Sequence, residues 1–281
     1  MSRLLLCTDL DRTLLPNGKQ PESEQARRKF NQLAVHSQVT LAYVTGRHQQ
    51  LVEQAIEKYL LPPPRYVIAN VGSAIYEIND NHWRFMEAWE NLIKRDWRTK
   101  SAIELHDLFV HIKDIQLQEA DKQSNHKLSY YVSLNSNHQK IISTMENALE
   151  QNSITANLIW SIDQQANIGL LDVLPASAGK RQAIEFLMQH LDFDYSNTVF
   201  AGDSGNDICV LSSPIQSVLV ANADEDVRNE AIQQAQANQQ EDALYLAQGN
   251  FMGMNGNYSA GILEGVVHYI PQAKLWLRGE A

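Results

Sequence analysis

The sequence predicts an α/β protein whose main parallel sheet is interrupted by a smaller inserted α+β module. Short apolar runs alternate with amphipathic helical stretches, the pattern of parallel strands joined by helices. Three of these apolar runs end in clusters of polar residues. The alternation changes in the middle of the chain, where tryptophan and charge are more frequent, and then returns. Both ends of the chain are therefore expected to build one sheet.

The first part of the chain contains two apolar runs, RLLLCT and VTLAYV, that are typical of short buried strands. Three prolines at residues 62–64 end the helix that follows the second run, because proline lacks an amide hydrogen. The predicted order is strand 3–8, helix 22–33, strand 39–44, helix 48–60, strand 66–70 and strand 73–77.

The middle of the chain has a different residue composition and pattern. Residues 83–114 are predicted to be helical, and the run KLSYYVSL alternates like a half-buried strand. Further predicted elements are helix 139–150 and strands 127–134, 158–162 and 169–174. Because no linker rich in glycine and serine is present, the crossings are expected to be short. The predicted domains are the core at residues 1–84 and 174–281 and the inserted module at residues 85–173.

The last part of the chain returns to alternating strands and helices. A short apolar run, TVFA, predicts a buried strand that leads into a glycine-rich polar turn. The predicted order is helix 179–191, strand 198–201, helix 207–211, strand 217–220, helix 224–237 and helix 260–267.

Composition excludes several classes of protein. The 281 residues include 33 acidic and 23 basic side chains, for a net charge of -10, which argues against binding nucleic acid or an anionic membrane. No apolar run reaches the roughly 18 residues of a membrane span, and the N-terminal run meets Asp9 too early for a signal peptide. Two cysteines cannot supply a disulfide framework. A reduced, cytoplasmic setting is expected.

Polar clusters follow three of the predicted strands. They are Asp9 to Thr13 (DLDRT), Thr45 to Arg47 (TGR) and residues 202–207 (GDSGND). Ligands of open α/β sheets bind beyond the carboxyl ends of the strands. If the three strands are neighbours, the clusters converge on one site.

Asp9 and Asp11 lie two residues apart, so on an extended chain they point to the same side. Two such carboxylates can hold Mg²⁺, or can divide the roles of nucleophile and acid/base. Asp203 and Asp207 are a second acidic pair with glycines around them, and oxygen ligands suit a hard cation. Either pair could instead belong to an ordinary turn or helix cap.

Thr45 and Gly46 follow a strand and precede a helix, where a hydroxyl and backbone amides form a seat for an anion. Arg47 could bind phosphate with two nitrogens or pair with a surface acid. Lys180 stands in a first helical turn, which the helix dipole disfavours. It therefore either faces an anion or is a solvated lysine.

Together these segments resemble the haloacid dehalogenase (HAD) phosphohydrolase superfamily. DLDRT, VTGR, Lys180 after a proline-containing turn and GDSGND match its four motifs in order and spacing over nearly the whole chain. The resemblance implies a Rossmann-like core with the α/β cap of the Cof-like subclass. Further strings, such as ANVGSAIYE, KLSYYV and SAGILEGV, are similar to the sucrose-phosphate phosphatase group. Arg181 departs from the pattern, since relatives often have glycine after the motif lysine.

The resemblance implies a role for each matched residue. Asp9 would attack phosphorus to give an aspartyl-phosphate, and Asp11 would protonate the leaving sugar oxygen and later deprotonate water. A carboxyl group with this first role must carry a proton, so we expect a raised pKa for Asp11. The phosphoryl group would be held by Thr45, Gly46, Lys180 and Asn206.

Mg²⁺ is the cofactor that the resemblance implies. Its ligands would be Asp9, the backbone carbonyl of Asp11 and Asp203, with Asp207 as a further ligand or as an orienting group. Four converging acids would repel a phosphate unless a cation offsets them. The acidic balance therefore predicts an obligatory divalent cation.

The inserted module would choose the substrate. The candidates for contacts with the sugar are Arg47 from the core and Lys127, Tyr130 and Asp172 from the module. Ser129 and Tyr131 share the strand, and alternation turns one of two adjacent tyrosines inward. Any of these could instead be core packing or solvated.

The expected activity is hydrolysis of a sugar phosphate, with sucrose 6-phosphate preferred. The alternatives are a phosphatase for another glycoside phosphate, such as a mannosyl or glucosyl compatible-solute precursor, and a phosphomannomutase-like mutase. A glycosyltransferase with a metal-binding Asp-x-Asp and a non-catalytic scaffold explain fewer of the motifs. The expected partner is a small sugar phosphate, and association with the synthase that makes it is a further expectation.

Overall fold

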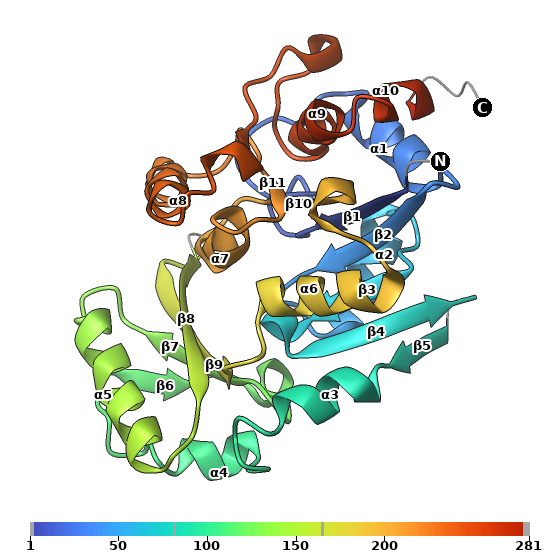
Figure 1. Ribbon diagram of the computed structural model, residues 1–281. Coiled ribbons are helices and arrows are strands. Elements are labelled where there is room, and N and C mark those ends of the chain that lie inside the picture. The colour runs from blue at the N-terminus through green and yellow to red at the C-terminus, as the bar shows by residue number, and fades with distance from the viewer. Residues whose placement is uncertain (1–2, 81, 164–165, 278–281) are drawn as a thin grey trace.

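The computed structural model describes residues 3–80, 82–163 and 166–277, and in this part of the chain it contains two sheets (Figure 1). The larger sheet has eight strands in the order β12-β11-β10-β1-β2-β3-β4-β5, and the smaller has four in the order β6-β7-β9-β8. The strands from β12 to β3 are parallel neighbours. The predicted α/β class is confirmed.

The larger sheet draws on both ends of the chain. Its strands are β1 (Leu4–Thr8), β2 (Val39–Val44), β3 (Tyr66–Ala69), β4 (Ala74–Asn79), β5 (His82–Phe85), β10 (Thr198–Gly202), β11 (Gln216–Leu219) and β12 (Leu244–Leu246). β5 pairs antiparallel with β4 at one edge. The prediction of helix from residue 83 was wrong there, because the aromatic and charged residues of β5 alternate along a half-exposed edge strand.

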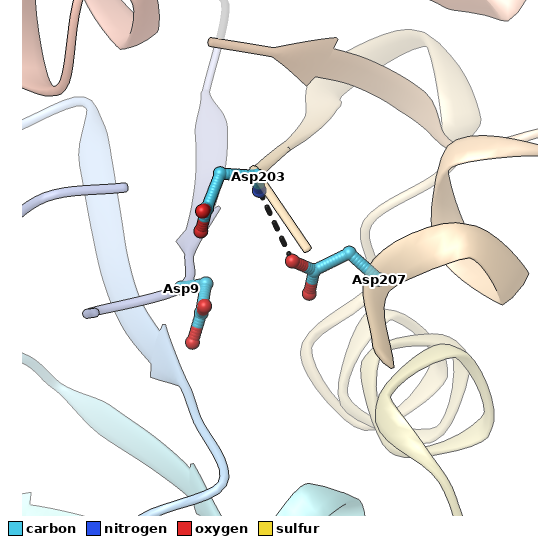
Figure 2. Close-up of side chains that lie close together, drawn as sticks. All are labelled: Asp9, Asp203 and Asp207. Atoms are coloured by element: carbon cyan, nitrogen blue, oxygen red, sulfur yellow. Dashed lines mark hydrogen bonds between the residues drawn. The ribbon is translucent and has the colours of Figure 1, made fainter. Parts of the chain in front are cut away.

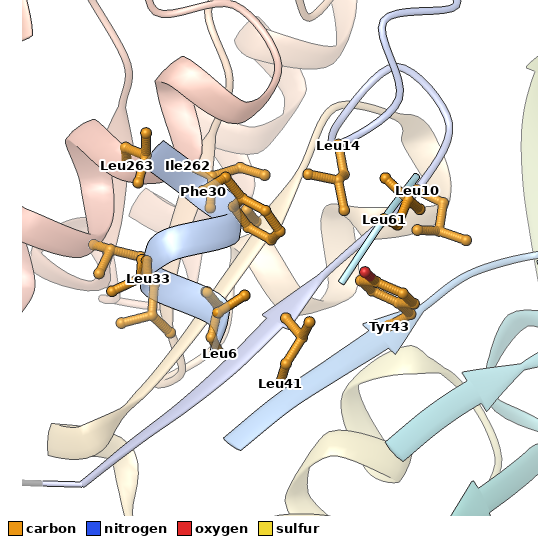
Figure 3. Packing of buried hydrophobic residues seen from close by; sticks show 14 of the residues in the cluster. Leu6, Leu10, Leu14, Phe30, Leu33, Leu41, Tyr43, Leu61, Ile262 and Leu263 are labelled. Atoms are coloured by element: carbon orange, nitrogen blue, oxygen red, sulfur yellow. The ribbon is translucent and has the colours of Figure 1, made fainter. Parts of the chain in front are cut away.

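Helices cover both faces of the larger sheet. Leu4 and Leu6 pack in one apolar cluster and Leu5 and Cys7 in the other, so the central strand is buried on both sides. Figure 3 shows the first cluster, where Phe30 and Ile262 come from helices and Leu6 from β1. The first cluster includes α1 (Ala26–Ala34), α2 (Gln49–Tyr59), α9 (Ser259–Tyr269) and α10 (Ala273–Trp276), and the second includes α3 (Glu87–Ile93), α6 (Lys180–Leu191), α7 (Ile208–Leu211) and α8 (Glu225–Ala237).

The smaller sheet is antiparallel and carries its helices on the side away from the larger sheet (Figure 1). Its elements are α4 (Ala102–His106), β6 (Ile115–Leu117), β7 (Leu128–Val132), α5 (His138–Gln151), β8 (Ala156–Asp163) and β9 (Ile168–Pro175). Trp97, Tyr130 and Met145 fill the core beneath these helices. Trp89 of α3 packs instead with the core of the larger sheet. The predicted domain limits remain a proposal.

Within the described residues, no helix has both the length and the apolar character needed to cross a membrane.

Candidate active site

The three predicted polar clusters lie at one edge of the larger sheet. β10, β1 and β2 are parallel neighbours, so their carboxyl ends are adjacent. Asp9 directly follows β1, and its amide donates to the carbonyl of Ala201 at 2.9 Å. Thr45 follows β2 and Asp203 follows β10. The sequence therefore brings these side chains together by ending three neighbouring strands in polar residues.

Three carboxylates form the centre of this site. Asp9, Asp203 and Asp207 each offer an oxygen atom, and these atoms lie within 4.8 Å of one another (Figure 2). All three side chains are buried. Burial is the main reason that the pKa of Asp9 lies well above its ordinary value, and the neighbouring acids raise it further although Lys180 lowers it. Burial and Asp207 raise the pKa of Asp203 to about 7.

Lys180 is the buried cation of the site. Its Nζ lies 2.7 Å from Asp207 Oδ1, 2.7 Å from Asn206 Oδ1 and 3.3 Å from Asp9 Oδ1. Burial alone would lower the pKa of Lys180, but the attraction of Asp207 and Asp9 outweighs it and raises the pKa. Lys180 is therefore a fixed positive charge, and all three of its ammonium protons have an acceptor within reach. The position that the helix dipole disfavours is explained by these acids.

Two glycines set the position of Lys180 at the start of α6. Gly179 precedes the helix with φ of +140°, and Gly72 has φ of +102°. A Cβ atom on Gly72 would lie 2.2 Å from the carbonyl carbon of Gly179 and 2.7 Å from the amide nitrogen of Lys180. The turn after β3 is therefore packed directly against the backbone that carries Lys180.

The donor set fits a divalent cation. Asp203 Oδ1 accepts a hydrogen bond from Thr13 Oγ1 at 2.8 Å, whereas Asp203 Oδ2 is buried with no hydrogen-bond partner among the described residues. A buried carboxylate oxygen without a partner is costly, and a hard cation with oxygen ligands would remove that cost. A carboxylate oxygen of Asp9 lies within 4.8 Å of one of Asp203 (Figure 2).

Asp207 differs from the other two acids because its oxygens are already used. Oδ2 accepts from the backbone amides of Asp203 and Ser204, each at 3.1 Å, and from the Ser204 hydroxyl at 3.1 Å. Oδ1 is bound to Lys180. This arrangement suits an orienting group that holds the backbone of Asp203 and the ammonium of Lys180.

The expected raised pKa of Asp11 was wrong. Burial would raise it, but Arg47 donates from Nε at 2.7 Å and from Nη2 at 2.6 Å, and Asn17 donates at 2.7 Å. These donors, with the charge of Arg47, lower the pKa of Asp11 below its ordinary value. The structure shows the alternative in which Arg47 pairs with an acid. The sequence pattern did not identify Asp11, 36 residues away in the chain, as that acid.

Thr45 and Gly46 lie in the predicted place at the edge of the sheet. The Thr45 side chain is buried and its hydroxyl accepts from the Arg47 amide at 3.2 Å. α2 begins three residues beyond Gly46, after His48. Thr45 and Gly46 thus line the cavity from the strand end rather than from the first turn of the helix.

A cavity of about 670 Å³ separates this edge of the larger sheet from the smaller sheet. Asp9, Asp11, Asp203 and Asn206 contribute to its floor. On the opposite side the cavity is lined by Gln118, Lys122, Lys127, Tyr131, Ser161, Ile162, Asp163, Leu170 and Asp172. The cavity is therefore shared by the predicted core and the predicted module.

The wall formed by the smaller sheet contains a buried polar cluster. Lys127 Nζ lies 3.5 Å from Asp172 Oδ1, and it also donates to the carbonyl of Lys122 at 3.3 Å. Ser129 donates its hydroxyl to Asp172. Lys127 and Asp172 line the cavity, as expected for residues that contact a substrate.

Tyr130 was wrongly chosen as a substrate contact. Its side chain is fully buried in the core of the smaller sheet and its hydroxyl lies 2.8 Å from Nδ1 of His106, away from the cavity. Its neighbour Tyr131 lines the cavity instead and donates to Glu119. Alternation along β7 requires one tyrosine on each face, but it does not say which face is the core.

Sequence reasoning missed other residues around the cavity. Arg12 stands inside the first motif, and its side chain reaches Asp203 and Asp224. Asn17 binds the carboxylate of Asp11. Gln118 and Lys122 belong to a connection before β7 that carries no motif. Arg12 could have been found from its place in DLDRT, whereas the connection gave no signal.

Comparisons with known sequences agree with this geometry. The family described as sucrose-6F-phosphate phosphohydrolase matches residues 2–270. An uncharacterised HAD-like hydrolase of Nitrosococcus oceani is 48% identical over 98% of this chain and 74% of its own length. Sucrose-phosphatase 1 of Nicotiana tabacum is 30% identical over 80% of this chain, which spans about half (52%) of that protein. The glucosylglycerol-phosphate synthase of Pseudomonas anguilliseptica is 24% identical over 95% of this chain and 31% of its own length.

Solved structures share the fold. The sucrose-phosphatase of Synechocystis sp. PCC6803, solved with sucrose and phosphate, superposes with a TM-score of 0.78 at 24% identity, over 96% of this chain and 99% of the other. A haloacid dehalogenase-like hydrolase of Bacillus subtilis gives 0.63 at 17% identity, over 96% and 93%.

Proposed function

The chain belongs to the sucrose-6F-phosphate phosphohydrolase family of HAD phosphoric monoester hydrolases, and on that premise we propose that it hydrolyses sucrose 6-phosphate to sucrose and phosphate. The observation that carries the proposal is the group of three buried carboxylates at the base of the cavity, two of which, Asp9 and Asp207, contact Lys180. Enzymatic hydrolysis of a phosphate monoester needs a nucleophile, fixed positive charge and exclusion of water from the first step. The floor offers the first two and the smaller sheet covers it.

In the proposed reaction Asp9 attacks phosphorus, the bond from phosphorus to the sugar oxygen breaks, and an aspartyl-phosphate forms. Asp11 gives a proton to the departing sugar oxygen and then takes one from the water that cleaves the aspartyl-phosphate. Thr45 and Asn206 hold the phosphoryl oxygens, and the fixed charge of Lys180 behind the acids offsets their negative charge. Hydrolysis through a covalent intermediate divides one very slow step into two faster ones.

Asp11 must be protonated for its first step, but Arg47 holds it ionised in the free protein. We propose that the substrate phosphate attracts Arg47 and loosens its two bonds to Asp11. Guanidinium binds phosphate with two parallel hydrogen bonds, as it binds a carboxylate. The contact of Arg47 with the substrate, expected from the sequence, would then also allow Asp11 to take up the proton that it donates.

We propose Mg²⁺ as the cofactor, held by Asp9 and Asp203 with the backbone carbonyl of Asp11, and oriented by Asp207. When bound, it would supply positive charge that neutralises the phosphoryl group in the transition state. Asp203 Oδ2, which lacks a hydrogen-bond partner among the described residues, and the crowding of buried acids support this assignment.

The cavity wall opposite the acids would select the sugar. Lys127 and Asp172 are buried but line the cavity, and Tyr131 offers a ring and a hydroxyl beside them. Buried polar groups that line a cavity disfavour ligands that leave them unpaired. We propose these three residues, within a cap at residues 85–173, as the contacts for the sugar.

A second candidate substrate is a glucosylglycerol phosphate. The likeness to a glucosylglycerol-phosphate synthase over nearly the whole chain favours it. A cytoplasmic location and association with the synthase of the substrate are further proposals. A pull-down with this chain, followed by identification of a sugar-phosphate synthase, would test the association.

The test is release of inorganic phosphate from a panel of sucrose 6-phosphate, trehalose 6-phosphate, glucosylglycerol phosphate, mannosylglycerate phosphate and glucose 6-phosphate, with Mg²⁺. We expect the largest kcat/KM for sucrose 6-phosphate. Asp9→Asn, which keeps size and burial, is the matched control and should release none. An isomerised sugar phosphate without free phosphate would establish a mutase instead, and no turnover of any compound would contradict a phosphatase.

A further inference from the structure

One positively charged side chain beside the acid trio, Asp9, Asp203 and Asp207, has no part in the proposed reaction. Arg12 follows Asp11 in the chain and lines the cavity. Its Nε lies 3.4 Å from Asp203 Oδ2, the oxygen that has no hydrogen-bond partner among the described residues. The other oxygen of Asp203 is occupied by Thr13. Arg12 thus faces the atom that is free for a metal ion.

The guanidinium of Arg12 is anchored on its far side. Nη1 donates to Asp224 Oδ2 at 3.0 Å and Nη2 to the carbonyl of Asn222 at 3.4 Å. The Asn222 amide in turn donates to the Arg12 carbonyl at 2.6 Å, and its oxygen accepts from the Tyr258 amide at 2.7 Å. Arg12 therefore cannot leave Asp203 without breaking bonds to a second loop.

Arg12 and Asp203 attract each other without sharing a hydrogen bond. Arg12 Nε is itself buried and has no hydrogen-bond partner among the described residues. The side chain of Arg12 is 21% exposed and that of Asp203 is 1% exposed, so water screens this pair weakly. The positive charge stabilises ionised Asp203, while the oxygen itself stays available to another ligand.

We propose that Arg12 sets the affinity of the acid trio for its divalent cation. Without the cation, Arg12 offsets part of the charge of Asp203, and an arriving cation meets its repulsion. Asp9 and Asp203 then bind the cation more weakly than they would without the charge of Arg12. Arg12 acts through Asp203 and is a positioning residue. The inference rests on the divalent cation of the proposed function.

The backbone of Arg12 decides which variants test this. Its φ is +59°, a conformation that asparagine and glycine tolerate best. Arg12→Asn removes the charge and suits that backbone, and Arg12→Gly is a second neutral variant should the first fold poorly. Arg12→Lys keeps the charge. The matched control is Arg27→Gln, because Arg27 pairs with Glu22 at 3.0 Å with similar exposure (24%) and does not line the cavity.

The experiment is a calorimetric titration of the full chain with Mg²⁺ in the absence of substrate. We expect Arg12→Asn to bind Mg²⁺ about tenfold more tightly, equal to ~1.4 kcal/mol of lost repulsion. The Mg²⁺ affinity of Arg12→Lys should stay within about threefold of that of the parent, and the affinity of Arg27→Gln should equal that of the parent. In chelator, Arg12→Asn should melt at a lower temperature, and Mg²⁺ should raise its Tm by more than it raises that of the parent.

Each result decides a different point. Equal Mg²⁺ affinity in the parent and in both neutral variants overturns the role of Arg12 and leaves the phosphatase intact. A lower Tm with an unchanged shift by Mg²⁺ shows a purely structural residue and also overturns it. A raised KM with unchanged Mg²⁺ affinity shows that Arg12 binds the substrate instead. A parent chain that binds no Mg²⁺ removes the cation from the proposed function, and this inference with it.

Discussion

Two buried lysines lie on opposite sides of the cavity, Lys180 behind the acids and Lys127 in the opposite wall, and they are held very differently. The side chain of Lys180 is 0% exposed, and its Nζ lies 2.7, 2.7 and 3.3 Å from oxygens of Asp207, Asn206 and Asp9. Lys127, in the opposite wall, is 7% exposed and has one carboxylate at 3.5 Å and one carbonyl at 3.3 Å. An ammonium group has three protons to donate. Lys180 is saturated by the protein, whereas Lys127 keeps capacity for a ligand.

The difference separates two tasks. A saturated, buried lysine holds the charge balance of the acids fixed, which chemistry on a phosphate requires. A loosely held lysine beside Asp172 can exchange a weak contact for a stronger one with a sugar hydroxyl. We therefore expect the floor of the cavity to set kcat and the opposite wall to set KM.

Removal of the divalent cation is the strongest way to separate the two sides. With excess chelator we expect phosphate release to fall to background, because four acids then oppose the phosphate, and Mg²⁺ should restore it. Binding of the product sugar to the wall should persist in chelator, measured by calorimetry. Turnover without any divalent cation would contradict the assignment of the floor.

Replacement of each lysine by methionine compares the sides directly. Lys180→Met should lower kcat by on the order of 10²–10³-fold, because a fixed charge on the phosphoryl group is lost. It should also lower the free energy of unfolding, since the buried acids lose their partner. Lys127→Met should raise KM by about tenfold with kcat nearly unchanged. Equal effects on kcat from both variants would contradict the assignment of kcat to the floor and KM to the opposite wall.

The two adjacent tyrosines of β7 test the wall with a smaller change. Tyr131→Phe removes a hydroxyl beside the cavity that donates to an exposed Glu119, and it should raise KM by about threefold with little change in the stability of the fold. Tyr130→Phe removes the bond to His106 in the core and should cost about 1 kcal/mol of stability without changing KM. A change of KM in Tyr130→Phe but not in Tyr131→Phe would contradict the assignment of Tyr131 to the cavity wall and Tyr130 to the core.

Arg47 and Asp11 form a pair of intermediate burial, with 23% and 43% of their side chains exposed. The pKa of Asp11 is lowered in the folded protein, so ionised Asp11 stabilises the fold above its unfolded pKa of ~3.9, and this contribution is lost as the pH falls through the lower folded value. Arg47→Gln should therefore lower the free energy of unfolding at pH 7, and its difference from the parent should become smaller as the pH is lowered to 3. Urea unfolding at both pH values measures this, and a constant difference would exclude the linkage.

The sequence was most informative where chemistry and regular structure coincide. Apolar strands that end in acids, and a lysine that opens a helix against its dipole, are local patterns, and the structure brings Asp9, Asp203 and Lys180 together as expected. The class of the fold followed from the same alternation.

What could not be predicted depends on contacts between distant segments. Two adjacent tyrosines fit either face of β7, and only packing under α4 and α5 decides which one is core. The pKa of Asp11 depends on Arg47, 36 residues away in the chain. The edge strand β5 was hidden because its polarity resembles that of an exposed helix.

The contact between Gly72 and Gly179 limits how this protein can be altered. Any side chain at residue 72 would collide with the backbone that presents Lys180, so the turn after β3 and the start of α6 cannot be varied independently. The cavity wall opposite has no such constraint at Lys127 or Tyr131. A library intended to change the accepted sugar should randomise that wall and keep both glycines fixed, since the path to new substrates runs through residues that the catalytic lysine does not touch.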